Sequence, residues 1–195
     1  MNYPYAFMQF LFLGLADLIF DFLGLFVVAI AISFRKPGTS VQDGRPITNL
    51  PKWAYPWGND FDGLLGDSQG WWAANTPFGL PPDSFLSMYV WAAIRNPANN
   101  TRMFSIFNAP IQGSQIEYKG DFFVGDHPGE SGFQFVKLTH EGIWPRYGLY
   151  WVRQWTSKHA SVIRLGFKIS PDQIYTNELP KGSTFRINPW KRIAS

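Results

Sequence analysis

The chain has 195 residues, no Cys and a formal net charge of +3, and 46% of its residues are hydrophobic while only 16% are charged. This length fits one modest domain with an appendage, and the apolar content excludes a wholly disordered chain. The missing Cys excludes a disulfide scaffold, a thiolate metal site and a Cys nucleophile, and it suits a reducing compartment.

The first predicted element is a hydrophobic, transmembrane-type helix at residues 1–36. Its only charged side chains before the end of the apolar run are Asp17 and Asp21. The run from Ala6 to Phe34 is longer than the roughly 20 residues that a membrane span needs. We therefore expect this segment to be sheltered by lipid or by other chains.

The sequence Arg35-Lys36-Pro37-Gly38 predicts the end of this helix, because two cations meet the negative end of the helix dipole and two helix breakers follow. A cleaved signal peptide begins with basic residues, whereas here the basic residues follow the apolar run, so we expect no cleavage. The positive-inside rule places these cations in the cytoplasm, with the N-terminus outside and the C-terminal domain cytoplasmic.

Gly14, Asp17, Asp21 and Gly24 recur every three or four residues and share one narrow helix face. Glycines permit close approach of another helix, and carboxyl groups can bond across such a seam. The stripe predicts self-association into a homo-oligomer. Two alternatives stay open. In the first, the carboxylates line an ion path; in the second, both Asp residues lie in water near the outer interface and only Leu18–Phe34 spans the membrane.

Residues 37–82 form the second predicted segment, which is irregular because Pro and Gly interrupt it repeatedly. It is rich in Trp, Tyr and Phe, so it either lies along lipid headgroups or wraps the domain surface, and we favour the second. Four oxygen donors within it raise the alternative of a calcium loop: Asn59, Asp60, Asp62 and Asp67. Because Gln69 stands where an EF-hand needs Glu, we favour Asx-type turns and expect no metal.

Residues 83–195 predict a β-rich domain that begins with a short helix at 84–95. Asp83 or Ser84 would cap this helix and Asn96-Pro97 would end it. The period then changes to two, which predicts strands at Met103–Phe107, Gln115–Val124, Gly132–His140, Leu149–Thr156, Val162–Ile169 and Phe185–Asn188. Turns are expected at 108–113, 125–129 and 157–159. The fold class is therefore a hydrophobic helix plus a mainly-β, α+β domain, built as an antiparallel meander, a sandwich or a partly open barrel.

Five polar residues lie near turns or aromatic-rich strands of this domain, namely Arg95, Asn96, Arg102, Arg146 and Arg164. Because Arg donates hydrogen bonds in a planar fork, we interpret them as a polar network that ties helix, turn and sheet together. The alternative is a site for an anion or a phospholipid headgroup.

Catalytic motifs are weak in this sequence. Gly129-Glu-Ser-Gly132 lacks the spacing of a nucleophile elbow, and no phosphate-binding loop occurs. His140 and Glu141 would make an acid–base pair without an evident substrate. We therefore expect a protein that is not an enzyme and has no cofactor and no small-molecule substrate. The positive charge is dispersed, which argues against nucleic acid as a partner.

Four stretches resemble sequences in small uncharacterised membrane-anchored proteins of tailed bacteriophages, over about residues 50–190: Trp57–Gly63, Arg95–Asn100, Arg146–Trp151 and Ile163–Lys168. The resemblance implies a viral, host-membrane or virion context and no activity. The predicted function is a phage-encoded protein anchored in the host inner membrane that acts by self-association and partner binding. The alternatives are a virion structural or DNA-ejection protein, with its hydrophobic helix packed against other virion proteins, and a hydrolase that acts on the envelope.

Overall fold

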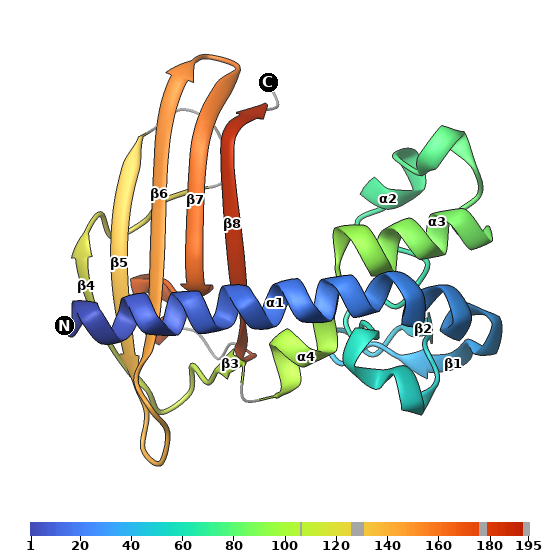
Figure 1. The fold of residues 1–195 in the computed structure, drawn as a ribbon, viewed down its shortest axis with the longest axis horizontal. Helices are drawn as coiled ribbons and strands as arrows, with labels where there is room; N and C mark the ends of the chain where they lie inside the picture. The colour runs from blue at the N-terminus through green and yellow to red at the C-terminus, as the bar shows by residue number, and fades with distance from the viewer. Residues whose placement is uncertain (106, 126–130, 176–178, 193–195) are drawn as a thin grey trace. The chain divides into compact units, whose positions relative to one another are not determined.

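The computed structural model describes residues 1–105, 107–125, 131–175 and 179–192. The chain divides into two compact units, whose elements are labelled in Figure 1. The sheet unit comprises Met1–Ala16 and Ile106–Ser195, and the helical unit comprises Asp17–Ser105. This division differs from the expected segments 1–36, 37–82 and 83–195. Those segments follow composition, whereas folding packs the start of the chain against strands near its other end.

Helix α1 (Tyr3–Ala31) is the predicted hydrophobic helix, and it contributes residues to both units. At its start the backbone N–H of Tyr5 donates to Oδ1 of Asn2 across 3.1 Å, which caps the first turn. At its end a short 3-10 helix, η1 (Ile32–Phe34), is closed by the backbone N–H of Arg35, which donates to the carbonyl of Ile32 at 3.2 Å. The predicted end of the helix is confirmed.

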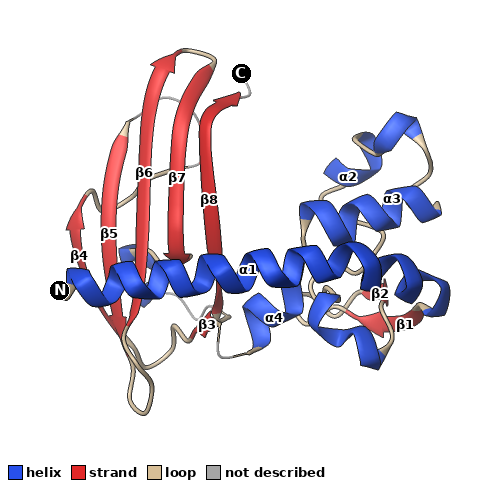
Figure 2. Cartoon of the chain, viewed as in Figure 1, coloured by secondary structure: helices blue, strands red, loops and turns tan. Residues whose placement is uncertain are grey.

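The sheet unit contains one antiparallel sheet in the order β3-β8-β7-β6-β5-β4, shown in Figures 1 and 2. Its strands are β3 (Asn108–Ala109), β4 (Gln115–Gly120), β5 (Gly132–Thr139), β6 (Arg146–Thr156), β7 (His159–Phe167) and β8 (Lys181–Arg192). A 3-10 helix, η5 (Pro171–Tyr175), follows β7. Strands β4 to β8 form the predicted antiparallel meander. The described strands of this unit make one open sheet, neither a closed barrel nor a sandwich.

The core of the sheet unit lies between this sheet and the first half of α1. Ala6 and Phe10 of the helix are buried in one cluster with Phe135 and Tyr147. Leu13, one turn further along, is buried in a second cluster with residues of β3, β5 and β7. Burial of each large apolar side chain stabilises the fold by about 1.5–3 kcal/mol.

The outer edge of β8 is covered only at its beginning. Strand β3 pairs Asn108 with Gly182 and Ala109 with Lys181, whereas β8 continues to Arg192. Within the described residues, most of this strand therefore pairs on one side alone, with β7.

Two strand predictions need correction. The strand predicted at Met103–Phe107 is wrong, because its first two residues belong to helix α4 (Asn99–Phe104) and Ser105 and Phe107 are not in a strand, while residue 106 lies outside the described residues. Five mostly apolar residues are too few to distinguish a strand from a helix, and side chains of α4 are held by long-range contacts described below. Strand β4 ends at Gly120 rather than at Val124, because Asp121 turns back and accepts the backbone N–H of Phe133 at 2.8 Å.

The predicted turns have three outcomes. At 108–113 the first two residues form β3 and a turn follows. Residues 126–129 of the second predicted turn lie outside the described residues. The third is confirmed as the tight connection between β6 and β7, although His159 already belongs to β7.

The helical unit surrounds the second half of α1 with short elements. They are β1 (Lys36–Thr39), β2 (Pro46–Asn49), η2 (Lys52–Trp57), α2 (Trp71–Ala74), η3 (Pro77–Gly79), α3 (Phe85–Tyr89), η4 (Val90–Arg95) and α4. Strands β1 and β2 pair as an antiparallel hairpin. The core joins Val28, Ala31 and Ile32 of the first helix to Leu64 and Met88.

The short helix expected at 84–95 is confirmed. Ser84 caps it by accepting the backbone N–H of Ser87 at 3.2 Å, and it ends before Asn96. Its second half, η4, is a π-helix. The wider π turn places Trp91 in the core, where its indole N–H donates to the carbonyl of Gly63 at 3.0 Å.

Candidate functional site

Helix α1 has one face covered by its own chain. The covered positions recur every three or four residues along the helix, which is the spacing of one helical face. They are Ala6, Phe10, Leu13, Gly14, Asp17, Asp21, Gly24, Val28 and Ala31. Each contacts residues of its own unit, so the predicted small and acidic stripe is part of this covered face.

The two glycines of the stripe allow close approach, as the sequence predicts, but the neighbour comes from the same chain. A Cβ built on Gly14 would stand 2.5 Å from Cδ2 of Phe185 on β8. A Cβ on Gly24 would stand 2.9 Å from Cδ1 of Trp57 in η2. Aromatic rings thus occupy the space that a second helix would need at these two positions.

The two acidic residues of the stripe bind one arginine. Nε of Arg102 on α4 donates to Oδ1 of Asp17 at 3.1 Å, and its Nη2 donates to Oδ1 of Asp21 at 2.9 Å. The Arg102 and Asp17 side chains are only 20% and 13% exposed. The two carboxylates therefore differ from both alternatives, since they are ion-paired with a partly buried guanidinium of α4 rather than lining an open ion path or being hydrated by water alone.

Further polar contacts tie α1 to each unit. In the sheet unit, the Gln9 side chain donates to the carbonyl of Pro145 at 2.9 Å and accepts the backbone N–H of Tyr147 at 2.8 Å. In the helical unit, the indole N–H of Trp57 donates to the carbonyl of Phe20 at 2.8 Å. The sequence analysis did not identify Gln9, whose only signal is that it is polar within an apolar run.

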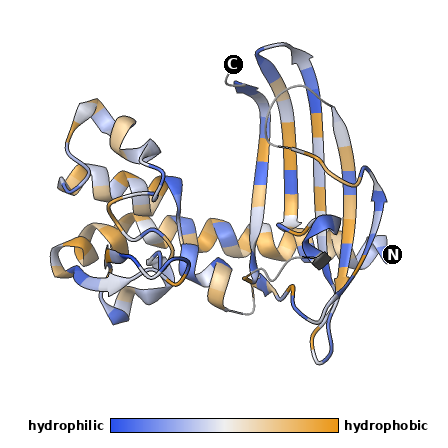
Figure 3. Ribbon diagram, turned by 180° about the vertical axis from the view of Figure 1, so that it is seen from behind, coloured by the Kyte–Doolittle hydropathy of each residue, from blue (hydrophilic) through white to orange (hydrophobic). Residues whose placement is uncertain are grey.

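The opposite face of α1 is exposed and apolar, apart from the hydroxyl of Tyr3, which accepts a hydrogen bond from Nζ of Lys119 at 2.7 Å. Exposed fractions on this face range from 43% for Leu23 to 66% for Leu18. The uncovered face comprises Tyr3, Phe7, Met8, Leu11, Phe12, Leu15, Leu18, Ile19, Phe22, Leu23, Phe26 and Ile30. Figure 3 shows the hydrophobic character of this helix. By length and composition the helix is able to cross a membrane, and an apolar surface of this extent marks a site of contact with lipid or protein.

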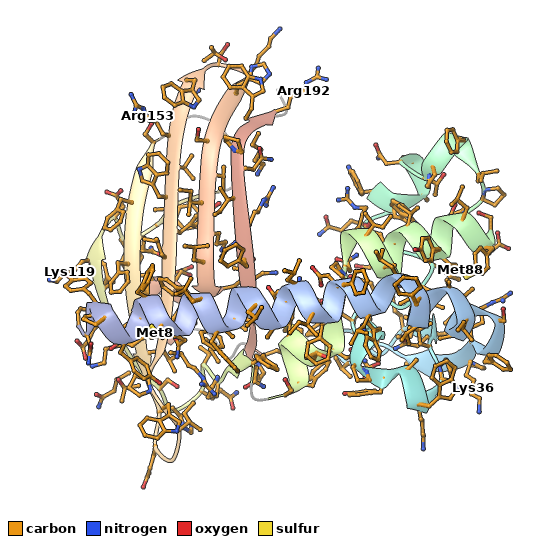
Figure 4. The ribbon with its side chains drawn as sticks, in the orientation of Figure 1. Met8, Lys36, Met88, Lys119, Arg153 and Arg192 are labelled. Carbon is orange, nitrogen blue, oxygen red and sulfur yellow. The ribbon has the colours of Figure 1, made fainter. Side chains whose placement is uncertain are left out.

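Aromatic and basic side chains gather where α1 ends. The Phe34 and Trp53 rings lie 6.4 Å apart, edge to face, and both are more than half exposed. Arg35, Lys36 and Lys52 are exposed beside them in sequence, and Lys36 is labelled in Figure 4. Aromatic rings with adjacent cations are the composition of a membrane–water boundary.

The aromatic segment 37–82 folds into the helical unit. The Phe61 ring stacks on Phe104 with centroids 5.6 Å apart, and Trp72, which is 2% exposed, packs against Trp91 at 5.0 Å. Other rings stay at the surface, and Phe78 is 94% exposed. The segment therefore wraps its own unit while it also presents aromatic side chains outward.

The four oxygen donors at 59–67 form Asx turns and protein hydrogen bonds. Oδ1 of Asn59 accepts the backbone N–H groups of Phe61 and Asp62. Asp60 is held by the side-chain amides of Asn49 and Asn100. Among the described residues no group of three or more His, Cys, Asp or Glu is arranged to hold a metal.

Asp67, the last of these donors, caps α2. It accepts backbone N–H groups from Gln69, Trp71 and Trp72, at 2.9, 3.1 and 2.9 Å. Partial burial raises the pKa of this carboxyl, but the three backbone donors together lower it more, so its pKa lies below the usual value.

The five polar residues proposed as one network have separate partners in two units. In the helical unit, Arg95 lies 4.2 Å from the centroid of the Trp71 ring, and the Asn96 amide donates to the carbonyl of Trp91 at 3.5 Å. Arg102 binds the α1 carboxylates, a pairing that the sequence analysis missed.

The remaining two arginines belong to the sheet unit. Nε of Arg146 donates to the carbonyl of Asn108 at 3.2 Å, and its guanidinium lies 5.1 Å from the Phe167 ring. Arg164 lies 4.6 Å from the Tyr150 ring. Each residue thus ties neighbouring elements of its own unit together.

His140 and Glu141 do not form a side-chain pair. Nδ1 of His140 lies 2.8 Å from the backbone oxygen of Glu141, in the turn before β6. A general acid–base role would require a carboxylate within hydrogen-bond reach of the ring, so this contact gives no support to the hydrolase alternative.

Comparison with known proteins places the chain in a family without naming an activity. No curated protein and no solved structure matches it. A family model described as a family of unknown function (DUF7338) matches residues 1–195, and the chain belongs to that family.

Proposed function

We propose that the protein is a membrane-anchored binding protein in which α1 lies along the membrane surface with its uncovered face in the lipid. The observation that carries this proposal is the division of one helix into two faces. Four polar side chains of α1 form hydrogen bonds with the rest of the chain, namely Tyr3, Gln9, Asp17 and Asp21. In each unit, the part of α1 that the unit holds leaves an apolar face exposed, from Phe7 onward in the sheet unit and up to Ile30 in the helical unit. An exposed apolar face on a helix whose other face is polar or covered is the pattern of a helix that lies in the interface.

A helix lying in the surface fits these contacts better than a spanning one. If α1 crossed the bilayer alone, Gln9, Asp17 and Asp21 would lose their partners and enter hydrocarbon, at a cost of a few kcal/mol for each carboxylate. Crossing together with its partners would carry Arg102 and the backbone around Pro145 and Tyr147 into the lipid. Lying flat requires neither change.

We infer the side of the membrane from the charge at its boundary. Anionic lipids of a cytoplasmic leaflet attract cations at the boundary by about 1 kcal/mol each, and Arg35, Lys36 and Lys52 lie at the end of α1. Together with the missing Cys and the resemblance to phage proteins, this supports a host inner membrane with the folded units in the cytoplasm. The protein would act there by binding a partner and not by catalysis.

Self-association of α1 remains part of the proposal, but on a different surface. The stripe of Gly14 and Gly24 already contacts Phe185 and Trp57. A second copy would meet the uncovered face instead. The virion alternative uses the same face, covered by other virion proteins in place of lipid.

The orientation can be tested with spin labels, because the chain has no native Cys. Single cysteines replace Phe7, Leu15, Phe22 and Ile30 on the uncovered face, and Lys158→Cys, in the exposed β6–β7 turn, is the control. In anionic vesicles we expect the four labels to lie at one similar depth, about 5–10 Å below the headgroups, and the control to lie in water.

Other depth profiles would identify the alternatives. A profile that is deepest at Leu15 and Phe22 and shallow at both ends would mean that α1 spans the bilayer. Four labels shielded from both water and lipid would mean that protein covers this face, as the virion alternative requires. For the hydrolase alternative, His140→Ala and Glu141→Ala should leave the biological phenotype unchanged.

A further inference from the structure

Two adjoining cavities lie in the sheet unit, between the first half of α1 and the turn that precedes β6. The larger has a volume of about 490 Å³ and is lined mainly by apolar side chains, including Met8, Phe12 and Leu13 of α1 and Ile143 of the turn. This volume falls within the range of ligand pockets, roughly 300–1,000 Å³. The cavity is therefore large enough for a small apolar ligand.

The larger cavity is continuous with the uncovered face of α1. Met8 and Phe12 belong to both, and they are 63% and 58% exposed; Met8 is labelled in Figure 4. Trp144, on the other wall, is 73% exposed. A hydrocarbon chain that starts in the bilayer can enter this cavity without leaving apolar surroundings.

One charged side chain, Arg146, lines the larger cavity. Two of its contacts are the hydrogen bond from Nε to the carbonyl of Asn108 and the approach of the guanidinium to the Phe167 ring. Arg146 is partly buried, and burial lowers the pKa of its guanidinium. A guanidinium has several N–H donors in a planar fork and forms strong charge-assisted hydrogen bonds with carboxylate and phosphate groups.

The smaller cavity shares Tyr5 and Trp144 with the larger one and has a volume of about 390 Å³. It is lined by more polar residues, among them Asn2 and Lys137. Nζ of Lys137 also lies 2.7 Å from Oε1 of Glu117. An anion in this cavity would therefore share Lys137 with that carboxylate.

We infer that the larger cavity binds the acyl chain of an anionic amphiphile, whose acid group meets Arg146. This inference rests on the proposed function and names the class of ligand that the membrane-facing surface takes up. Two sources have this chemistry, a free fatty acid and an anionic phospholipid. A fatty acid needs only the larger cavity, whereas a phospholipid headgroup would extend into the smaller one towards Lys137.

The test uses a photoreactive palmitate analogue with the full chain in a nonionic detergent, followed by mapping of the labelled peptides. We expect labelling of the peptide that contains Ile143 and of the part of α1 that contains Met8. Ile143→Trp, which fills the cavity, should reduce this labelling about tenfold. Ile187→Trp, on exposed β8 outside both cavities, is the matched control and should label normally.

The charge requirement is tested by competition. Unlabelled palmitate should compete about tenfold better than uncharged hexadecanol, as expected for a charge-assisted hydrogen bond. Arg146→Gln should abolish this preference, while Arg164→Gln, in the same sheet but outside both cavities, should keep it. This measurement decides the question even if Ile143→Trp fails to fold.

A third comparison separates the two sources. If Lys137→Gln weakens competition by dipalmitoyl phosphatidic acid and leaves palmitate unaffected, the ligand is a phospholipid. If palmitate competes equally well in the wild-type chain and in Lys137→Gln, and phosphatidic acid does not compete, the ligand is a fatty acid.

Two outcomes would overturn the inference: labelling spread evenly along the uncovered face, and labelling that Ile143→Trp and Arg146→Gln leave unchanged. Vesicle binding of the same variants keeps the two proposals apart. A chain that binds vesicles but shows no cavity labelling retains the proposed function and loses the acyl site. A chain that does not bind vesicles loses the proposed function itself.

Discussion

Arg102 and Asp17 stand 85 positions apart in the sequence, yet Nε of the arginine donates to Oδ1 of the aspartate across 3.1 Å. Both side chains are largely buried, and the same guanidinium reaches Asp21. This contact fixes the second half of α1 to α4 within the helical unit. It explains why a helix as apolar as α1 keeps two carboxylates.

Arg102→Met should therefore destabilise the helical unit by about 2 kcal/mol, because two partly buried carboxylates lose a charged donor. Urea unfolding followed by Trp fluorescence measures the change. Arg95→Met, which removes a cation–π contact with Trp71, should cost clearly less. Adding Asp17→Asn and Asp21→Asn to the Arg102→Met variant should lower the free energy of unfolding only a little further. A further loss as large as the first would mean that the three side chains do not act as a unit.

Gly14→Leu should destabilise the sheet unit by about 1–3 kcal/mol, the usual range for an overpacked contact. The cause is the Phe185 ring, which leaves no room for a Cβ. The same substitution in a Phe185→Ala background should cost much less, because the ring is gone. Equal costs in both backgrounds, together with lost crosslinking between copies, would instead assign Gly14 to self-association.

Acid should weaken the contacts by which Asp67 caps α2. The pKa of Asp67 lies below its usual value of 3.8 in the folded chain, because three backbone N–H donors stabilise the carboxylate despite partial burial. Its contribution to stability is thus complete above the unfolded-state pKa and is lost as the pH falls through the lower, folded-state pKa. The fluorescence of Trp71 and Trp72 should report this change below about pH 4. Asp67→Asn should remove this pH dependence, and an unchanged acid response in that variant would assign the response to another group.

Lys36→Gln and Lys52→Gln should each weaken binding to anionic vesicles about fivefold, from roughly 1 kcal/mol per cation near the surface. The effect should shrink as salt is added, because screening shortens the reach of the charges. Flotation with vesicles measures both. Lys158→Gln, at the exposed β6–β7 turn, is the control, and an equal loss in that variant would show that net charge alone drives binding.

Local patterns predicted most of the fold. The apolar run predicted α1, Ser84 predicted the start of α3, and the period of two predicted the meander from β4 to β8. These features depend on residues that are neighbours in sequence. The strand predicted at Met103–Phe107 failed for the same reason, because α4 is held by distant partners of its side chains.

The candidate site was predicted only in part. The sequence showed that Gly14, Asp17, Asp21 and Gly24 share a close-contact face, but it did not show what meets that face. Arg102 was assigned to a turn network because nothing local links it to α1. The cavities beside Arg146 depend on the packing of α1 against the turn before β6, which no pattern in the sequence displays.

Most of the outer edge of β8 has no partner strand among the described residues, and this affects how copies of the chain behave at high density. Unpaired strand edges invite other chains to add strands, which leads to aggregates. Among the described residues, β8 beyond the two positions paired with β3 carries Pro189, which has no N–H to donate, and the charged residues Arg186, Lys191 and Arg192, a composition that disfavours the addition of another strand. Copies of the chain at high density on one bilayer would thus not pair along this strand edge, and they would not form a continuous intermolecular β-sheet.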